Sequence, residues 1–321
     1  MKIMMNVTDC IYDTSRFEDG EDALRFASEF GCDGLEVMHC IGGDEEFFAP
    51  DTVIGVHLRY FSEWLDLWNG DMESLKEEYG TLEKAREIYG GLDRESLIRY
   101  HEEDIARAVK KNPSYVVFHV SNVKTSDVYT YTCSHTDEEV IDAAAELINQ
   151  LLDGKDYQFE FLMENLWWPG LTMTKPEMTK RLLDKVHYPK KGIMLDTGHL
   201  MHSNLELKTQ EDAIDYILEM VEAHGNLRRY IRGIHLNQSI TGDYVKNLVK
   251  NHKMPEDYEE RFSDCYQHIF NIDCHLPFTT SRVRELVDAV KPEYLTHEMI
   301  SMDREDHAEK LAKQAKALGA G

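Results

Sequence analysis

Ile193-Met194-Leu195-Asp196 is a short apolar run that ends in a carboxylate. Runs of this kind, bounded by turn signals, are typical of buried parallel strands. Three further segments have the same build: Phe161-Leu162-Met163-Glu164, Gly233-Ile234-His235 and Tyr294-Leu295-Thr296-His297-Glu298. A barrel of parallel strands collects its strand C-termini around one mouth. These segments can therefore bring three carboxylates and an imidazole to a single point.

Glu164, Asp196, His235 and Glu298 form a donor set that suits a hard or borderline divalent cation. Any one of these residues alone could simply be a polar residue at the end of a strand, without a metal ion. Taken together, buried carboxylates without a cation or a charged partner are costly. We therefore predict that these residues bind a divalent metal ion, with Mn, Zn, Mg and Co as the candidates.

Strand-like and helix-like segments alternate along the 321 residues, which indicates βα units. A capping box at Thr136-Asp137-Glu138-Glu139 opens one of the helices. No linker or internal repeat interrupts the pattern, so we predict one (β/α)8 TIM barrel domain over residues 1–321. The expected strands lie near residues 2–7, 33–38, 53–58, 115–121, 159–164, 191–196, 231–236 and 293–298.

Two long loops follow the third and the seventh expected strand, at residues 60–92 and 239–278. Loops of this length are usually lids or binding segments. Both follow strand C-termini, so both are expected to overhang the same mouth. Trp64 and Trp68 are four residues apart in the first loop and are expected to bury one face of a lid helix.

The chain is strongly acidic, with 60 acidic against 35 basic residues and a formal charge of −25. This charge disfavours nucleic acid and anionic membranes as partners. No stretch approaches the roughly 18 apolar residues of a transmembrane helix, and the N-terminus is too quickly polar for a secretory signal. The six cysteines show no CxxC spacing, so we expect reduced thiols in a cytoplasmic protein. A homo-oligomer is compatible with these features.

Three motifs resemble those of the xylose-isomerase-like barrels: Met163-Glu164-Asn165, Leu195-Asp196-Thr197-Gly198-His199 and Ile234-His235-Leu236-Asn237. This superfamily includes sugar isomerases and epimerases, and the endonuclease IV branch of abasic-site nucleases (AP endonuclease family 2). The resemblance extends from the first strand to Glu298. It implies a metal-dependent enzyme and does not specify the substrate.

The endonuclease IV branch holds three zinc ions, and the resemblance implies ligands for each of them. By position, the groups would be His57, His119 and Glu164, then Glu164, Asp196, His235 and Glu298, and finally His199, Asp273 and His275. In the sugar branch, histidines at the mouth hydrogen-bond substrate hydroxyls instead. Two departures weaken the nuclease pattern: Gly198 stands where that branch usually has Cys, and the insertion before Asp273 is longer.

The first functional hypothesis is a one-metal isomerase or epimerase of carbohydrate metabolism that acts on a sugar, polyol or keto-sugar. As in the epimerases that the chain resembles, Glu164 and Glu298 would pass a proton through a metal-stabilised enediolate, and His199 would hold a substrate oxygen. The alternative is an endonuclease IV-like multinuclear zinc phosphodiesterase or hydrolase. The charge argues against DNA as its substrate, but not against a small phosphoester. A binding protein without turnover and an oxygen-activating iron site are further alternatives.

Residues beside the proposed ligands are candidates for substrate contact. Trp167 and Trp168 would form an apolar wall, although packing at the barrel rim explains them too. Asn165 and Asn237 each stand next to a ligand and would orient it or the substrate. Glu36 could lie at the mouth or fill a layer of the barrel. His39, His135 and His202 are expected on the solvated surface.

Overall fold

Eight strands form a closed parallel barrel in sequence order, in a computed structural model that describes residues 1–319. The strands are β1 Lys2–Thr8, β2 Gly34–Met38, β3 Val53–His57, β4 Tyr115–His119, β5 Glu160–Glu164, β6 Lys191–Asp196, β7 Ile231–Leu236 and β8 Tyr294–His297. The predicted (β/α)8 barrel is confirmed, and each predicted strand lies within two residues of the observed bounds.

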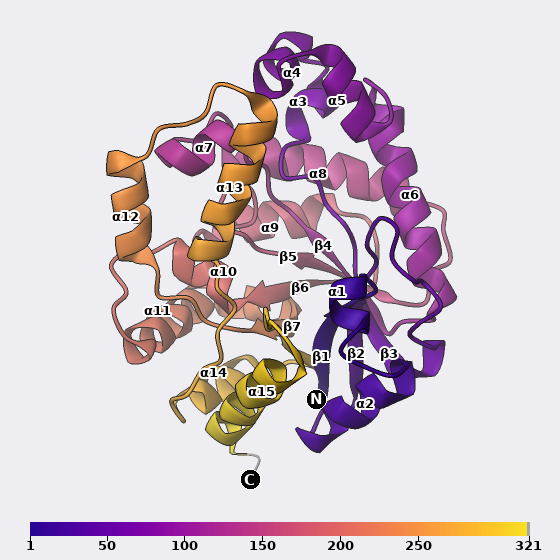
Figure 1. The fold of residues 1–321 in the computed structure, drawn as a ribbon, viewed down its shortest axis with the longest axis vertical. Coiled ribbons are helices and arrows are strands. Elements are labelled where there is room, and N and C mark those ends of the chain that lie inside the picture. The colour runs from indigo at the N-terminus through magenta and orange to yellow at the C-terminus, as the bar shows by residue number, and fades with distance from the viewer. Residues whose placement is uncertain (320–321) are drawn as a thin grey trace.

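Helices surround the barrel on its outer side (Figure 1). They are α1 Ile11–Thr14, α2 Gly20–Glu29, α6 Arg94–Lys110, α8 Asp137–Leu152, α9 Pro176–Lys185, α11 Gln210–Ala223, α14 Val283–Val290 and α15 Arg304–Leu318. Short helices α7 Thr125–Thr130 and α10 Thr197–His202 follow β4 and β6. Only the 3-10 helix η1 Pro50–Thr52 separates β2 from β3, and a second one, η2 Gly225–Tyr230, precedes β7. The capping box of Thr136 and Glu139 opens α8 as predicted.

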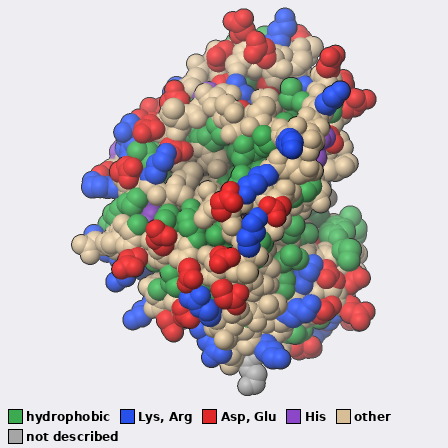
Figure 2. Space-filling view, turned by 90° about the vertical axis from the view of Figure 1, so that its left-hand side faces the viewer, with side chains coloured by type: hydrophobic (Ala, Val, Ile, Leu, Met, Phe, Trp, Pro, Cys, Tyr) green, Lys and Arg blue, Asp and Glu red, His purple; other side chains and the backbone are tan. Residues whose placement is uncertain are grey.

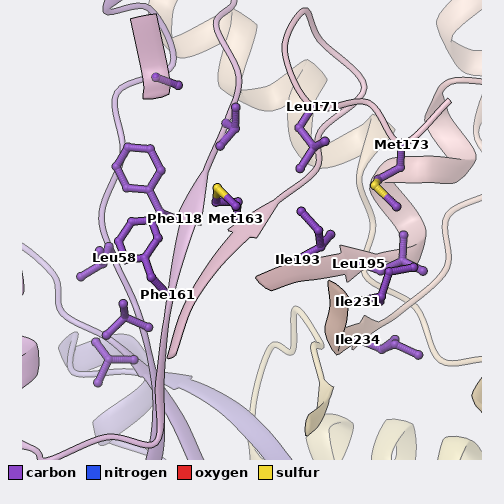
Figure 3. Packing of buried hydrophobic residues seen from close by; sticks show 14 of the residues in the cluster. Leu58, Phe118, Phe161, Met163, Leu171, Met173, Ile193, Leu195, Ile231 and Ile234 are labelled. Atoms are coloured by element: carbon purple, nitrogen blue, oxygen red, sulfur yellow. The ribbon is translucent and has the colours of Figure 1, made fainter. Parts of the chain in front are cut away.

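Alternation along the strands decides which side chains reach the barrel interior. In β4, Val116 and Phe118 pack into the large core outside the strands, whereas Tyr115 and Val117 belong to the small cluster inside the barrel. His119 continues the inward series. Figure 3 shows the outward residues of β4 to β7, among them Phe118, Phe161, Met163, Ile193, Leu195 and Ile234. The same alternation turns the last residues of β5 and β6 inward.

The two long loops fold into helical lids. Residues 60–92 contain α3 Leu65–Asn69, α4 Met72–Tyr79 and α5 Leu82–Tyr89, and residues 239–278 contain α12 Gly242–Asn251 and α13 Tyr258–Ile272. In Figure 1, α13 extends from the α3–α5 group towards α10. The lids touch where the rings of Tyr79 and Tyr258 lie 5.2 Å apart and Lys84 pairs with Glu259.

Trp64 and Trp68 are buried beneath the first lid, with their rings 6.3 Å apart. The expected burial of this lid is therefore confirmed. Trp64 lies at the N-terminal cap of α3, and its indole N–H donates to the Ser121 carbonyl at 2.8 Å. This bond fastens the lid to the segment that follows β4.

Cys10 and Cys40 form a disulfide, so the expectation of six reduced cysteines is wrong for this pair. The two residues follow the neighbouring strands β1 and β2, which brings their Cα atoms within 5.8 Å. Cys32, Cys133, Cys265 and Cys274 are free. Across residues 1–319, no helix combines the length and the apolar character that a membrane span requires.

Candidate metal centre

The C-terminal ends of six strands and one lid bring imidazoles and carboxylates together in the barrel mouth. The members of this mouth cluster are His57, His119, Glu164, Asp196, His199, His235, Asp273, His275 and Glu298. Each has an exposed fraction of 9% or less. Because so many ionisable groups are removed from water together, they must compensate one another or bind cations.

Glu164 lies at the centre of the mouth cluster, and its two oxygens face different imidazoles. Oε2 is 3.1 Å from Nε2 of His57 and 3.2 Å from Nε2 of His119. Oε1 is 3.2 Å from Nδ1 of His235 and 3.3 Å from Nδ1 of His199. A carboxylate that faces two separate pairs of imidazoles has the arrangement needed to bridge two cations.

Of the remaining members of the predicted four-residue set, Glu298 contacts His235 directly, whereas Asp196 is joined to Glu298 through the Asn237 amide. Glu298 Oε2 lies 3.3 Å from His235 Nδ1. The Asn237 amide donates to Asp196 Oδ2 at 2.7 Å and to Glu298 Oε2 at 3.2 Å. A Cβ at position 198 would lie 1.9 Å from Asn237 Oδ1, so Gly198 makes room for this amide. The departure from Cys at this position thus has a steric reason.

Asp273 joins two histidines in a third group. Its Oδ2 is 3.2 Å from His199 Nε2 and 2.8 Å from His275 Nε2. The Asn165 carbonyl lies 2.9 Å from His199 Nδ1, which holds the ring with Nε2 towards Asp273. Nδ1 of His275 is buried without a hydrogen-bond partner. An unpartnered buried ring nitrogen in such a group fits a cation ligand.

Triplets in the mouth cluster have ligand atoms that all lie within 4.8 Å of one another. They include His57, His119 and Glu164, then His57, His235 and Glu298, and His199, Asp273 and His275. The first and the third are the groups that the resemblance to the nuclease branch implies. Imidazole nitrogens with carboxylate oxygens suit zinc, manganese or cobalt. The residues present therefore fit divalent cations at more than one position.

The charges of the metal-free cluster are set by burial and by close partners. Burial raises the pKa of Glu298 to about 8. Burial disfavours the charged form of His275, yet the Asp273 carboxylate beside it raises its pKa to about 9. Burial would also raise the pKa of Glu164, but His235 and His119 hold that pKa well below its usual range. Around neutral pH, the metal-free cluster therefore retains protons on groups that could bind metal.

Zinc affinity is expected to rise with pH, because ligands must lose their protons before they bind. Glu298, with a pKa of about 8, and His275, with a pKa of about 9, hold protons at neutral pH. Each displaced proton strengthens binding by about tenfold per pH unit below the ligand's pKa. Calorimetric titrations in two buffers of different ionisation enthalpy count the released protons. Binding without proton release at pH 7 would contradict this assignment.

Glu36 lies beneath the mouth cluster, in a polar layer of the barrel. Its Oε1 is 2.9 Å from His235 Nε2, and both Tyr115 and Thr296 donate hydrogen bonds to its Oε2. His235 can therefore donate Nε2–H to Glu36 and turn an unprotonated Nδ1 towards Glu164 and Glu298. Carboxylates in this position fix the tautomer and the orientation of a metal-binding histidine.

Glu36→Gln is expected to weaken zinc binding by about tenfold, the low end of the range for such partners, because the amide keeps one acceptor but loses the charge. Competition against a chromophoric chelator measures the change. Tyr115→Phe is the matched control, since it removes a hydrogen bond from Glu36 and leaves its contact with His235. If Glu36→Gln binds zinc as tightly as this control, Glu36 does not position His235.

Three histidines expected on the surface have partners in the interior, which corrects that prediction. His202 is buried, and its Nε2 lies 3.1 Å from Asp273 Oδ1. His39 is buried against Asp9 at 2.8 Å, and His135 is half-buried against Asp66 at 2.9 Å. His202 follows His199 by three residues on α10, so helical spacing could have placed both on one face.

A cavity of about 520 Å³ adjoins the mouth cluster. On the cluster side it is lined by His119, His199 and Asp273. The remaining wall includes aromatic residues from both lids and from the segments around them: Tyr60, Phe61, Tyr79, Tyr100, Trp167, Trp168, Tyr258, Phe262 and Tyr266. The cavity thus connects the candidate metal ligands with an aromatic enclosure.

The residues expected to contact substrate take two different positions. Trp167 and Trp168 line the cavity, and the Trp167 ring lies 5.4 Å from that of His199. Asn165 and Asn237 are fully buried beside Asp196. The Asn165 amide exchanges two hydrogen bonds with the Asp196 backbone, at 2.9 and 3.1 Å. The two tryptophans thus border the cavity, and the two asparagines hydrogen-bond Asp196 of the mouth cluster.

Known proteins share this fold. The family model described as xylose isomerase-like TIM barrel matches residues 90–318. No curated protein matches the sequence. Similar solved structures include an L-ribulose 3-epimerase, with a TM-score of 0.57, 8% identity and coverage of 99% of this chain and 94% of that one.

Two other structures have comparable scores. Endonuclease IV from Thermus thermophilus has a TM-score of 0.54, 13% identity and coverage of 100% of both chains. A D-tagatose 3-epimerase-like protein has a TM-score of 0.52, 14% identity and coverage of 99% of this chain and 97% of that one. At these identities the likeness is one of fold. The matched family model extends over most of the barrel, and the chain belongs to the xylose isomerase-like TIM barrel family.

Proposed function

We propose that the protein is a multinuclear, divalent-metal-dependent hydrolase of a small phosphoester. The observation that carries this proposal is the position of Asp273 and His275, which form a buried ligand group with His199. Glu164 belongs to a separate triplet with His57 and His119, and its Oε1 lies 3.3 Å from the other ring nitrogen of His199, Nδ1. A one-ion site needs about four ligands, so the Asp273 group would remain available to hold a further ion.

Bound divalent ions would supply Lewis-acid activation of a phosphoryl oxygen and of water at neutral pH. The protein's own contribution is to fix the ligands and present them to the cavity. Glu36 holds His235, and His202 holds Asp273. A substrate in the cavity meets His119, His199 and Asp273, which border it.

The dimensions and charge of the molecule favour a small substrate. The cavity volume of about 520 Å³ lies within the usual range for small-molecule sites. Acidic and basic side chains are interspersed over the face in Figure 2 without a basic stripe, and the formal charge is −25. Lys124 lines the cavity, but its ammonium is paired with Asp66 at 2.7 Å. These features disfavour a nucleic acid backbone.

A sugar isomerase or epimerase, the first expectation from the sequence, is the second candidate. It is favoured by the placement of two carboxylates around one point: Glu164 Oε1 and Glu298 Oε2 lie 3.2 and 3.3 Å from His235 Nδ1. One carboxylate could remove a proton beside a substrate carbonyl and the other could return it. This chemistry needs one ion, and the Asp273 group would then hydrogen-bond substrate hydroxyls instead of binding metal.

Two assays on the zinc- or manganese-loaded protein separate these candidates. We expect release of p-nitrophenol from p-nitrophenyl phosphate or its bis ester, with loss of turnover on chelation and in Asp273→Ala. An isomerase would instead exchange deuterium from heavy water into a ketose beside its carbonyl, which proton NMR detects. Deuterium exchange without cleavage of either phosphoester would overturn the hydrolase proposal in favour of the isomerase.

A further inference from the structure

A second group of metal-ligand side chains lies outside the barrel mouth, in the lid of residues 239–278. Asp264 and His268 are four residues apart on α13 and therefore share one helix face. His252 follows the end of α12. Its Nε2 is 2.7 Å from Asp264 Oδ2, and His268 Nε2 is 3.6 Å from the same oxygen. The two Nε2 atoms are 3.4 Å apart.

These distances match the spacing of ligands around a tetrahedral ion. With bonds of about 2.0–2.1 Å, tetrahedral zinc places its ligand atoms about 3.3 Å from one another. The three observed distances between the ligand atoms, 2.7, 3.4 and 3.6 Å, lie on both sides of that value. The three side chains are 14–31% exposed, which leaves room for water as a fourth ligand.

Surrounding residues hold the three side chains in this orientation. The Tyr244 hydroxyl of α12 is hydrogen-bonded to His268 Nδ1, so Nε2 of that ring points into the group. The Tyr129 hydroxyl of α7 donates to Asp264 Oδ2 at 2.8 Å, and its ring stacks on His252 at 4.8 Å. Hydrogen bonds to the far nitrogen of a ligand histidine are usual in metal sites.

A proton shared between the two rings is the alternative explanation, since His268 Nε2 is also 3.2 Å from His252 Nδ1. That arrangement needs one of the rings to be neutral. A neutral ring carries a free electron pair on one nitrogen, and a free electron pair is also what a metal ion requires.

We propose that His252, Asp264 and His268 bind one transition-metal ion, with zinc as the best match, and that this ion braces the lid over the cavity. The site joins α7, α12 and α13 through the residues named above. α13 carries Cys265, Tyr266 and Ile269, which line the cavity. Fixing α13 therefore fixes one wall of the cavity. This site does not depend on which reaction the mouth cluster catalyses.

Zinc content of the full-length protein tests the proposal. The double variant His252→Ala/His268→Ala, dialysed against micromolar zinc and analysed by mass spectrometry, is expected to hold one ion fewer than wild type. The matched control is His187→Ala, which removes an exposed histidine 3.0 Å from Asp153 and is expected to keep every ion. Equal zinc content in the double variant and wild type would overturn the proposal.

Asp273→Ala distinguishes this site from the metal positions of the proposed function. The ion that it loses from the mouth cluster should be lost in addition to the ion that the double variant loses from the lid. Zinc-edge anomalous scattering from wild-type crystals decides the matter if the double variant does not fold. A peak between His252, Asp264 and His268 supports the proposal. A filled mouth cluster with no peak at these three residues overturns it. Hydrogen exchange should also slow across residues 242–272 when zinc is added to wild type, but not to the double variant.

Discussion

Asp273→Ala is expected to remove at least one metal ion from the mouth cluster and to lower phosphoester turnover by more than about 100-fold. Residues that only orient a metal ligand cost up to about 100-fold when they are replaced, and loss of a ligand should cost more. The reason is that Asp273 is the only carboxylate in the triplet with His199 and His275. Its Oδ2 lies within 3.2 Å of both rings. Metal analysis by mass spectrometry and p-nitrophenol release measure the two effects.

Asp243→Ala is the matched control for this variant. It lies in the same lid and is 79% exposed in its ion pair with Lys208, so it should change neither metal content nor turnover. If Asp273→Ala kept all of its ions and its activity, the multinuclear proposal would fail and the one-ion isomerase would be favoured.

Glu164→Gln is expected to have the largest effect of any single substitution in the mouth cluster. Glu164 is fully buried, and its oxygens lie 3.1–3.3 Å from four imidazoles. Neutralising it should empty the adjoining metal positions and abolish turnover. In the metal-free protein it should also lower the free energy of unfolding by roughly 3–5 kcal/mol, the cost of breaking a buried ion pair.

The stabilisation that Glu164 contributes to the folded protein depends on pH in a definite direction. Neighbouring histidines hold the folded-state pKa of Glu164 well below its usual range. Its stabilising contribution is therefore present above the unfolded-state pKa of about 4.3 and is lost as pH falls through the folded-state pKa. Urea titrations with a chelator at pH 7 should show the full difference between wild type and Glu164→Gln.

Glu160→Gln, at the opposite end of β5, is the control for Glu164→Gln. Glu160 pairs with Arg232 at 2.9 Å in a partly exposed position, and such pairs contribute at most about 1 kcal/mol. If Glu164→Gln were as stable as this control and bound as many ions, Glu164 would not be the centre of the cluster.

Strand alternation explains why the sequence predicts so much of the barrel. In β5, Phe161 and Met163 pack outward and Leu162 packs inward, so Glu164 must point into the mouth. Asp196 at the end of β6 points into the mouth for the same reason. Only the two-residue period of a strand and the closure of parallel strands in one direction are needed for this prediction.

Contacts between residues that are far apart in the sequence could not be predicted from it. To predict the Cys10–Cys40 disulfide, one must know that β1 and β2 are paired and in which register. The burial of His202 depends on its partner, Asp273, which comes from a lid 71 residues later. The spacing of Asp264 and His268 is visible in the sequence, but their proximity to His252 depends on how α12 packs against α13.

We propose above all that the mouth cluster binds more than one cation. Anomalous diffraction at the metal edges from crystals of the purified protein tests this claim most directly. We predict separate peaks beside His57 and His119, beside His235 and Glu298, and beside Asp273 and His275, with Glu164 shared between the first two. A single peak bound only by Glu164, Asp196, His235 and Glu298 would contradict the claim, and so would a mouth without any peak.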